Sequence, residues 1–403
     1  MRERPVNALA TRTAPPVASE PFFPKRSWLN SVRLRGAYGF SGNHPGTTDA
    51  LKFFAPKAAN VDNADVASLV DSSVGNPNLK PERAREIEIG GEATLLASRL
   101  YVDFTYYNKR TKDALIAATV PPSVGSGNVT QFENLGAVVN RGIEFLVAGQ
   151  LIDRPAFAWD ATLSGSYNTN FIADLGGVPP IIGTTIQQRQ GYPIDGYWQR
   201  PYTFRDLDGN GIITACTTVP ASACTVPNEV FVADSAVFVG YSQPRWEVTL
   251  TNGVDLFNRK VHVVGMFDLK AGYYLLDGTD RIRCQSRNNC RGLIDPTASL
   301  ADQAAVVALR ESGTTTQWGF MHKADFVRLR EASITYDLPS EWARGMRASA
   351  VSVTLAGRNL WKSSNYPGVD PESNYVTGAT GTVSDFQTQP PPTYWTFRLN
   401  VTF

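Results

Sequence analysis

The stretch YWTFRLNVTF occupies residues 394–403. From Trp395 onward every second side chain is apolar, and a polar residue fills each gap. The apolar set is Trp395, Phe397, Leu399, Val401 and Phe403. Because successive side chains of a β-strand point to opposite faces, this pattern predicts a strand with one apolar and one polar face.

The same alternation recurs along the chain and predicts about ten or eleven strands, each with the ~9–11 residues that a tilted membrane strand needs. The remaining segments are 31–41, 84–96, 99–113, 140–151, 157–170, 245–257, 260–272, 325–338 and 350–361, with a weaker candidate at 196–204. A strand that shows apolar residues to lipid and polar residues to a lumen has this two-faced pattern.

The predicted connections alternate in length. Tiny turns at 97–98, 152–155 and 258–259 interrupt a series of long polar connections, namely 42–83, 114–139, 205–244, 273–324 and 362–393. Antiparallel barrels of the outer membrane have short turns on one rim and long loops on the other. The sequence therefore predicts an all-β, antiparallel transmembrane barrel.

Composition excludes two other classes of protein. The net charge of +1, from 38 basic and 37 acidic residues, gives no electrostatic basis for a nucleic-acid groove. The apolar runs are far shorter than the ~18 residues of a membrane-spanning helix. With 33 Gly and 26 Pro the chain suits strands joined by turns, whereas the four Met and the scarcity of Leu-rich heptads argue against helices.

The amino-terminal segment, residues 1–21, carries early charges but no apolar region of 7–15 residues, so it does not resemble a secretory signal peptide. We expect it to be an unstructured or fragment-start segment. Residues 22–403 are expected to form the barrel portion with long extracellular loops.

Several segments together resemble the carboxyl-terminal barrel half of TonB-dependent outer-membrane receptors, and the SusC/RagA branch in particular. They run in the expected order from Phe22 to Phe403. They are 22–43, 76–115, 134–151, 321–339 (MHKADFVRLREASITYDLP), 355–361 (LAGRNLW), 366–372 (YPGVDPE) and the closing strand.

The resemblance implies active import of oligosaccharides, peptides or similar nutrients through a large plugged barrel in the outer membrane of a Gram-negative bacterium. It implies the lipid bilayer, a SusD-like surface lipoprotein and the TonB complex as partners, the last through an amino-terminal part. Such barrels have about 22 strands. Because no plug domain or TonB box is found here, the chain is interpreted as a barrel fragment; the alternative is a non-transporting remnant or a small passive barrel.

The closing strand also resembles the signal by which the barrel assembly machinery captures a final strand. The residues that would carry this signal are Trp395, Phe397, Leu399, Val401 and Phe403. The other interpretation is an ordinary half-buried edge strand.

The segment DLDGNGIIT, residues 206–214, contains half of a calcium loop: Asp206, Asp208 and Asn210 alternate, and a glycine follows. The twelfth position is Thr217, not the bidentate Glu. The loop would therefore bind calcium weakly unless Asp234 or Glu229 completed it, and the alternative is an ordinary Asp/Gly turn.

Four cysteines form two close pairs, Cys216 with Cys224 and Cys284 with Cys290. Both pairs lie in polar, turn-rich segments, so we expect two local disulfides in an oxidising compartment. The alternative is a zinc site formed by these cysteines, but their spacings fit no zinc finger.

Aromatic residues near strand ends or in loops are interpreted as a membrane-interface girdle rather than as sugar-stacking platforms. They are Tyr197, Trp198, Tyr202, Trp361 and Tyr366. His262 is expected to face the lumen. We expect no enzyme and no cofactor besides calcium, because no nucleophile motif accompanies this histidine.

Overall fold

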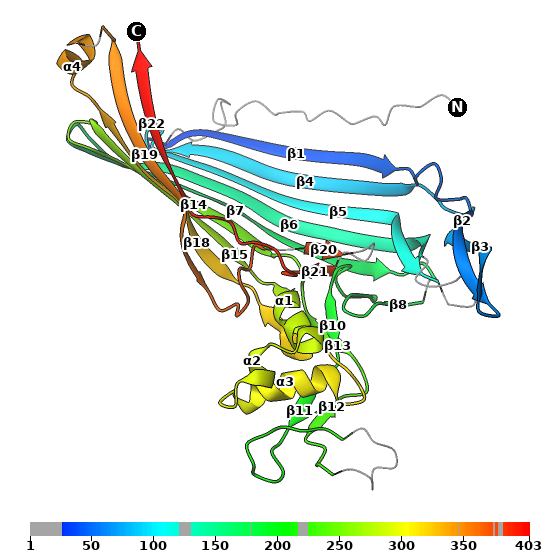
Figure 1. Ribbon diagram of the computed structural model, residues 1–403. Helices are drawn as coiled ribbons and strands as arrows, with labels where there is room; N and C mark the ends of the chain where they lie inside the picture. The colour runs from blue at the N-terminus through cyan, green and yellow to red at the C-terminus, as the bar shows by residue number, and fades with distance from the viewer. Residues whose placement is uncertain are drawn as a thin grey trace.

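A ten-stranded antiparallel sheet dominates the computed structural model (Figure 1). The structure describes residues 26–120, 130–177, 179–216, 225–345, 347–373, 375–377 and 382–403. The strands are β1 (Leu29–Asn43), β4 (Glu82–Leu95), β5 (Leu100–Thr119), β6 (Thr130–Arg154), β7 (Phe157–Asp174), β14 (Trp246–Leu256), β15 (Val261–Ala271), β18 (Phe326–Asp337), β19 (Ala350–Ser364) and β22 (Tyr394–Thr402). Their order in the sheet is their order in the chain, which confirms the all-β antiparallel prediction and the strand number.

The remaining elements lie outside this sheet. The strands are β2 (Phe53–Val61), β3 (Ala64–Ser73), β8 (Ile181–Ile182), β9 (Gln187–Gln188), β10 (Tyr197–Gln199), β11 (Tyr202–Phe204), β12 (Val230–Val232), β13 (Val237–Gly240), β16 (Tyr274–Leu276), β17 (Met321–Lys323), β20 (Tyr375–Thr377) and β21 (Thr382–Ser384). The helices are α1 (Gly278–Ile282), α2 (Arg291–Ile294), α3 (Leu300–Arg310) and α4 (Ser340–Gly345), with a π-helical turn at Arg283–Arg287 and a 3₁₀ turn at Trp318–Phe320. No helix in the described part of the chain combines the length and the apolar character of a membrane span.

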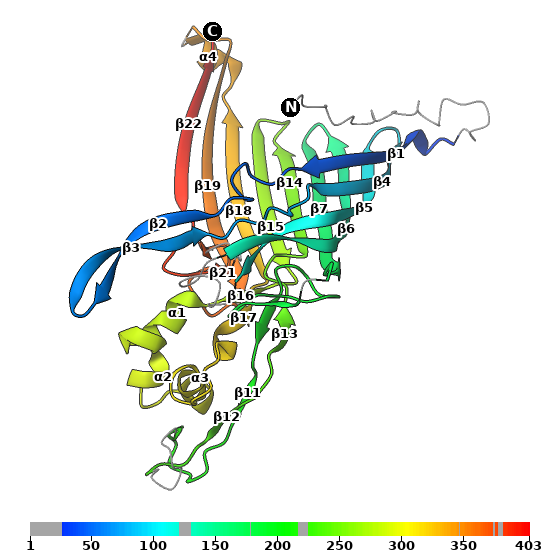
Figure 2. The ribbon, with the colours of Figure 1, turned by 90° about the vertical axis from the view of Figure 1, so that its right-hand side faces the viewer.

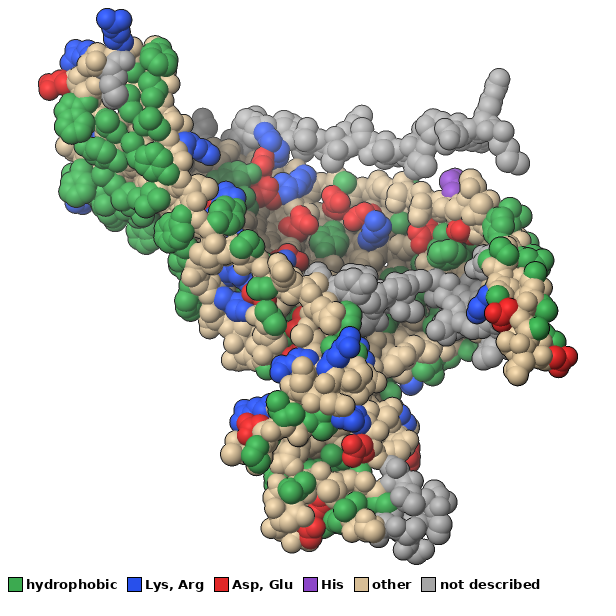
Figure 3. Space-filling model, viewed as in Figure 1, with side chains coloured by type: hydrophobic (Ala, Val, Ile, Leu, Met, Phe, Trp, Pro, Cys, Tyr) green, Lys and Arg blue, Asp and Glu red, His purple; other side chains and the backbone are tan. Residues whose placement is uncertain are grey.

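The sheet is a curved wall with two chemically different faces. On the outward face Leu355 of β19 lies between Ile334 of β18 and Phe397 of β22, and Phe397 is 70% exposed. On the inward face Arg33 pairs with Glu92 at 2.6 Å. Figure 3 shows charged side chains in the hollow of the wall and hydrophobic ones over the outer surface of the arm that carries the carboxyl terminus. This arrangement fits lipid outside and water inside.

Short and long connections fall on opposite rims of the wall (Figure 2). The turns after β4, β6 and β14, together with α4 and the carboxyl terminus, lie at one rim. The turn at 96–99 uses positive φ at Leu96, Ala97 and Ser98, which lets the chain reverse within four residues. The long connections gather at the other rim, where the apolar core of the protein is found.

Three details differ from the sequence prediction. The 114–139 connection is mostly strand, because β5 and β6 stay paired from Ala114–Leu135 to Thr119–Thr130. The apolar run after Lys112 breaks the alternation since Ala114 is buried with Val138 and Ile172 under loop residues. The candidate strand 196–204 is not part of the wall: β10 pairs with β13, and β11 with β12.

The third difference is the presence of helices in a connection that was expected to be a loop. Segment 273–324, expected to be a polar loop, contains α1, α2 and α3. The side chain of Ser299 accepts a hydrogen bond from the backbone N–H of Asp302 at 3.1 Å and caps α3. The residues Ala304, Val307 and Ala308 then recur at helical spacing and are buried, a local signal that the strand pattern elsewhere in the chain obscured.

Gly142 lies in the middle of β6, between β5 and β7. A Cβ there would approach the carbonyl oxygen of Tyr167 to 2.2 Å and the hydroxyl of Tyr107 to 2.6 Å. The space at this glycine is therefore taken up by the backbone of β7 and by the Tyr107 side chain of β5.

Replacing Leu355 by Arg places a charge on the lipid-facing side of the wall. We expect a loss of about 2–4 kcal/mol in the free energy of unfolding, because lipid cannot solvate the guanidinium. The matched change Ala356→Arg puts the same group on the inward face and should cost much less. Urea unfolding of both variants in lipid vesicles measures the difference. Equal losses would contradict the assignment of the two faces.

Candidate functional site

The long connections fold together into a unit that we call the loop assembly, formed by the described residues of 175–245, 272–325 and 365–393. Figures 1 and 2 show it projecting from the rim opposite the short turns. Its apolar core includes Ile186, Tyr197, Leu276, Cys284, Cys290, Val306, Leu309, Phe320 and Met321. These residues come from separate connections, so the loops form one packed unit rather than independent excursions.

A disulfide joins Cys284 to Cys290 next to α1 and α2. Both cysteines are buried in the core of the loop assembly. The other predicted pair includes Cys224, which lies outside the described residues, so the pairing of Cys216 with Cys224 stays a prediction.

The predicted calcium loop gains a third carboxylate in the fold. Oxygen atoms of Asp206, Asp208 and Glu229 lie within 4.8 Å of one another. The Asn210 side chain is turned to other partners, because its amide donates to Asp208 at 2.9 Å and its oxygen accepts from the backbone N–H of Ile212 at 2.7 Å. Of the two residues considered for completing the ligand set, Glu229 approaches the loop, whereas Asp234 lines a cavity elsewhere.

Glu229 is fully buried at the base of this loop. One carboxylate oxygen accepts a hydrogen bond from the backbone N–H of Leu207 at 2.7 Å, and the other accepts one from Thr214 at 2.9 Å. Burial acts to raise the pKa of Glu229, but these N–H donors outweigh it and leave the pKa below its ordinary value. The ionised Glu229 carboxylate therefore connects the two ends of the loop through hydrogen bonds. Calcium binding stays a prediction.

Calcium titration of the protein tests this prediction. We expect binding in the millimolar to submillimolar range, since three carboxylates without a bidentate twelfth residue make a weak site. Asp208→Asn should weaken binding about tenfold, whereas Asp234→Asn should leave it unchanged. Isothermal calorimetry measures both, and absence of binding heat at millimolar calcium would show that the segment is only a turn.

Most of the predicted girdle aromatics lie inside the loop assembly, so that interpretation is wrong for them. Tyr197 and Trp198 are 0% and 4% exposed, and Tyr366 is buried beside Tyr273. Tyr202 packs against the Val230 cluster near α3. Trp361 on β19 is exposed and remains a candidate for the membrane interface. The sequence pattern could not separate these positions, because rings at a membrane interface and rings in a loop core occupy similar places near strand ends.

His262 lies on the inward face of β15. Its Nδ1 is 2.7 Å from the carboxylate of Asp255, and its Nε2 is 3.1 Å from that of Asp337. Both ring nitrogens thus contact carboxylates of neighbouring strands, an arrangement that holds the strands together.

Two buried carboxylates, Asp277 and Asp385, lie close together at the start of α1. Asp277 accepts a hydrogen bond from the backbone N–H of Asp280 at 2.8 Å, and Asp385 accepts one from the Tyr366 hydroxyl at 2.7 Å. Burial, reinforced by the charge of Asp385, raises the pKa of Asp277 to about 7. Asp277 also borders a cavity of about 400 Å³ with Asp280 and His322.

The raised pKa of Asp277 predicts a pH-dependent stability. Between its ordinary pKa of 3.8 and about 7, the folded protein binds this proton more tightly than the unfolded chain does, so stability should fall as pH rises through this range. Asp277→Asn keeps a capping side chain and should flatten this dependence. Thermal unfolding across the range measures it. The exposed Asp65→Asn is the control, and an unchanged pH dependence in Asp277→Asn would contradict the prediction.

A buried charge cluster fastens the loop assembly to the wall. Arg328 of β18, 3% exposed, contacts Asp370 at 2.6 Å and Glu372 at 2.9 Å. Arg330 contacts Glu372 at 2.7 Å. The two acids belong to the 366–372 segment, so the RLR run of the strand and the YPGVDPE segment form one ion-pair network. Sequence reasoning noted both segments but gave no reason for them to meet.

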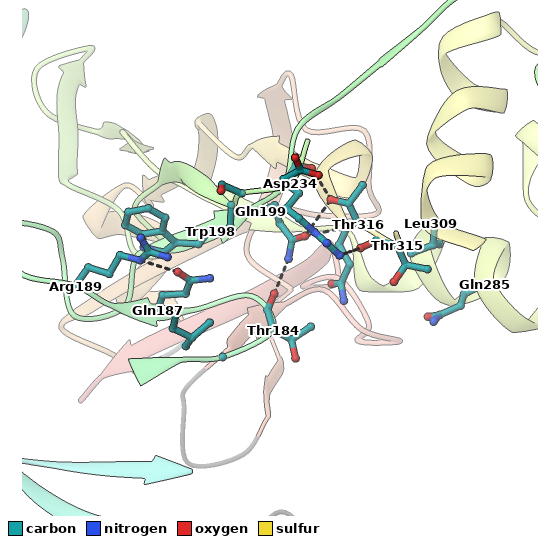
Figure 4. A pocket seen from close by; sticks show the side chains of 16 residues that line it. Thr184, Gln187, Arg189, Trp198, Gln199, Asp234, Gln285, Leu309, Thr315 and Thr316 are labelled. Atoms are coloured by element: carbon teal, nitrogen blue, oxygen red, sulfur yellow. Dashed lines mark hydrogen bonds between the residues drawn. The ribbon is translucent and has the colours of Figure 1, made fainter. Parts of the chain in front are cut away.

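The largest polar cavity that we describe in the loop assembly has a volume of about 530 Å³ (Figure 4). It lies between the 182–200 stretch, residues 234–236, and the 315–317 segment that follows α3. Gln187, Arg189, Trp198 and Arg200 supply polar groups to its lining. No motif in the sequence pointed to this site, because its members come from distant segments.

Comparisons with known proteins agree with this architecture. The family model described as "TonB dependent receptor-like, beta-barrel" matches residues 27–403. TonB-dependent receptor P3 of Formosa agariphila is 24% identical over 433 residues, which cover 96% of this chain and 41% of that protein. TonB-dependent receptor SusC of Bacteroides thetaiotaomicron is 24% identical over 326 residues, which cover 74% of this chain and 30% of SusC.

The fold also matches a solved structure. The RagAB peptide importer in its closed-closed state has a TM-score of 0.70 at 20% identity, over 95% of this chain and 42% of that chain. The chain thus spans about two fifths or less of the length of these relatives. Since the family model covers residues 27–403, the chain belongs to the TonB-dependent receptor β-barrel family, whose members are outer-membrane proteins, with similarity to SusC and RagA.

Proposed function

We propose that the chain forms part of the wall and the extracellular loops of a TonB-dependent importer of oligosaccharides, peptides or similar nutrients. The observation that carries the proposal is the curved ten-stranded wall, apolar outside and charged inside, with a packed loop assembly at one rim. A wall of this kind surrounds an aqueous lumen, and loops at its mouth are positioned to contact a ligand before it enters. No catalytic step is included in the proposal.

The sheet edges favour a section of a larger barrel over a small passive one. Among the described residues, β1 and β22 each have one neighbour, and they do not pair with each other. Lipid offers no hydrogen-bond partners, so an open strand edge is not stable in the hydrocarbon region. Additional strands pairing with β1 and β22 would close the wall, as in barrels of about 22 strands.

The proposal includes four kinds of partner. The lipid bilayer faces the apolar outer surface, and a SusD-like surface lipoprotein would cover the loop assembly. Energy would come from the TonB complex through an amino-terminal part. The barrel assembly machinery would capture β22 through Trp395, Phe397, Leu399, Val401 and Phe403, a role supported by their alternation on an exposed edge strand.

Import is tested by deleting the gene and measuring uptake of labelled oligosaccharide and peptide mixtures by living cells. We expect the deletion to abolish uptake of one nutrient class, and cells without TonB to show the same loss. Complementation with Ala356→Arg should restore uptake far better than Leu355→Arg, because only the latter disrupts the lipid-facing wall. Full uptake in the absence of TonB, or ion conductance by the purified chain in planar bilayers, would favour the passive barrel instead.

A further inference from the structure

The polar cavity of the loop assembly has a preorganised wall. The side chain of Gln199, 6% exposed, donates to the carbonyl oxygen of Thr184 at 2.7 Å and accepts from the backbone N–H of Gln317 at 3.0 Å. The Thr316 hydroxyl donates to the carbonyl oxygen of Arg200 at 2.6 Å. These contacts join the 182–200 stretch to the segment after α3, as Figure 4 shows, so the cavity lining is fixed before any ligand arrives.

Two buried polar atoms in this lining have no hydrogen-bond partner among the described residues: Nε1 of Trp198 and Oε1 of Gln317. The Trp198 ring is not free for stacking. The Arg189 guanidinium lies 4.5 Å from its centre, and the rings of Tyr192 and Phe238 pack against it at 4.7 and 5.7 Å. Both atoms are sealed inside the lining, so the packed Trp198 ring shapes the cavity, and the polar groups that a ligand can reach belong to other residues.

The charged side chains of the lining favour an anionic ligand. Nε of Arg189 donates to Gln187 at 2.8 Å, and a terminal nitrogen of Arg200 donates to the carbonyl oxygen of Thr315 at 2.8 Å. Within the described part of the chain neither guanidinium forms an ion pair, which leaves planar N–H donors on both. The carboxylate of the lining belongs to Asp234, which is exposed at the edge.

We propose that this cavity binds an organic carboxylate, with the guanidinium groups of Arg189 and Arg200 as the cationic donors available to it. Guanidinium groups match carboxylates in a two-pronged geometry, and hydrogen bonds to a charged partner are the strong ones. A uronic acid of an oligosaccharide and the carboxyl end of a peptide present the same group. This inference rests on the proposed import function in one respect: the ligand is taken to come from outside the cell.

Calorimetric titration of the protein in detergent tests the site with four probes. They are digalacturonate, its uncharged methyl ester, trialanine and trialanine amide. We expect one of the two acids to bind at least about tenfold more tightly than its neutral counterpart, since a charged hydrogen-bonded pair is lost in the latter. Digalacturonate binding would identify a sugar acid, and trialanine binding a peptide end.

Variants assign the binding to this cavity. At least one of the variants Arg189→Gln and Arg200→Gln should weaken binding of the acid about tenfold. Arg205→Gln removes an exposed arginine outside the lining and should bind as the unmodified protein does. Thermal unfolding of each variant distinguishes a lost contact from a lost fold.

Three results would overturn the proposal: equal affinity for acids and neutral probes, unchanged acid binding in both arginine variants, or no binding of any probe at about 10 mM. These outcomes can be distinguished from those of the import experiment. Failure of binding with TonB-dependent uptake intact would remove the carboxylate site and leave the importer. Binding of an acid without TonB-dependent uptake would keep the carboxylate site and remove the importer.

Discussion

The satisfaction of backbone hydrogen bonds between neighbouring strands is the constraint on which this structure depends. In lipid each N–H and C=O needs a partner on an adjacent strand, and the antiparallel registers between β1 and β22 provide it everywhere except along the two outer edges of the sheet. Because each register is fixed, side chains such as Leu355 and Ala356, adjacent in sequence, face opposite media. The two-faced character of the protein follows from strand pairing rather than from any single contact.

Because the apolar side chains of the wall face lipid, the packed apolar core of the protein lies outside the wall. A globular protein buries its apolar residues against one another, but here Ile334, Leu355 and Phe397 remain exposed because lipid is their solvent. The closely packed interior is in the loop assembly, where Tyr197, Leu276 and Phe320 come together from two connections. Such packing gives the loops defined positions, which a preformed binding surface requires.

Ion pairs connect the two parts. Arg328 and Arg330 project from β18 and meet Asp370 and Glu372 of the 366–372 segment, so the loop assembly is fastened to the wall by ion pairs, of which Arg328–Asp370 is buried. Removing one partner from such a pair leaves an uncompensated buried charge. A similar difference separates the carboxylates of the loops. Glu229 stays ionised because N–H groups donate to it, whereas Asp277 holds its proton more tightly because it is buried and lies beside another acid.

The sequence by itself determined the class of fold, the number of wall strands and the face that each residue of β22 presents, because a period of two is a local property of a strand. It also indicated the family through short motifs. It did not reveal that β5 and β6 stay paired beyond the alternating region, since Ala114 and Ile116 pack there against loop residues and the regular alternation of apolar and polar residues is lost. The tertiary structure alone brought Glu229 to Asp206, Asp370 to Arg328, and Arg189 to the cavity with Gln317. Contacts between residues tens of positions apart depend on how the connections pack, and no local periodicity encodes that packing.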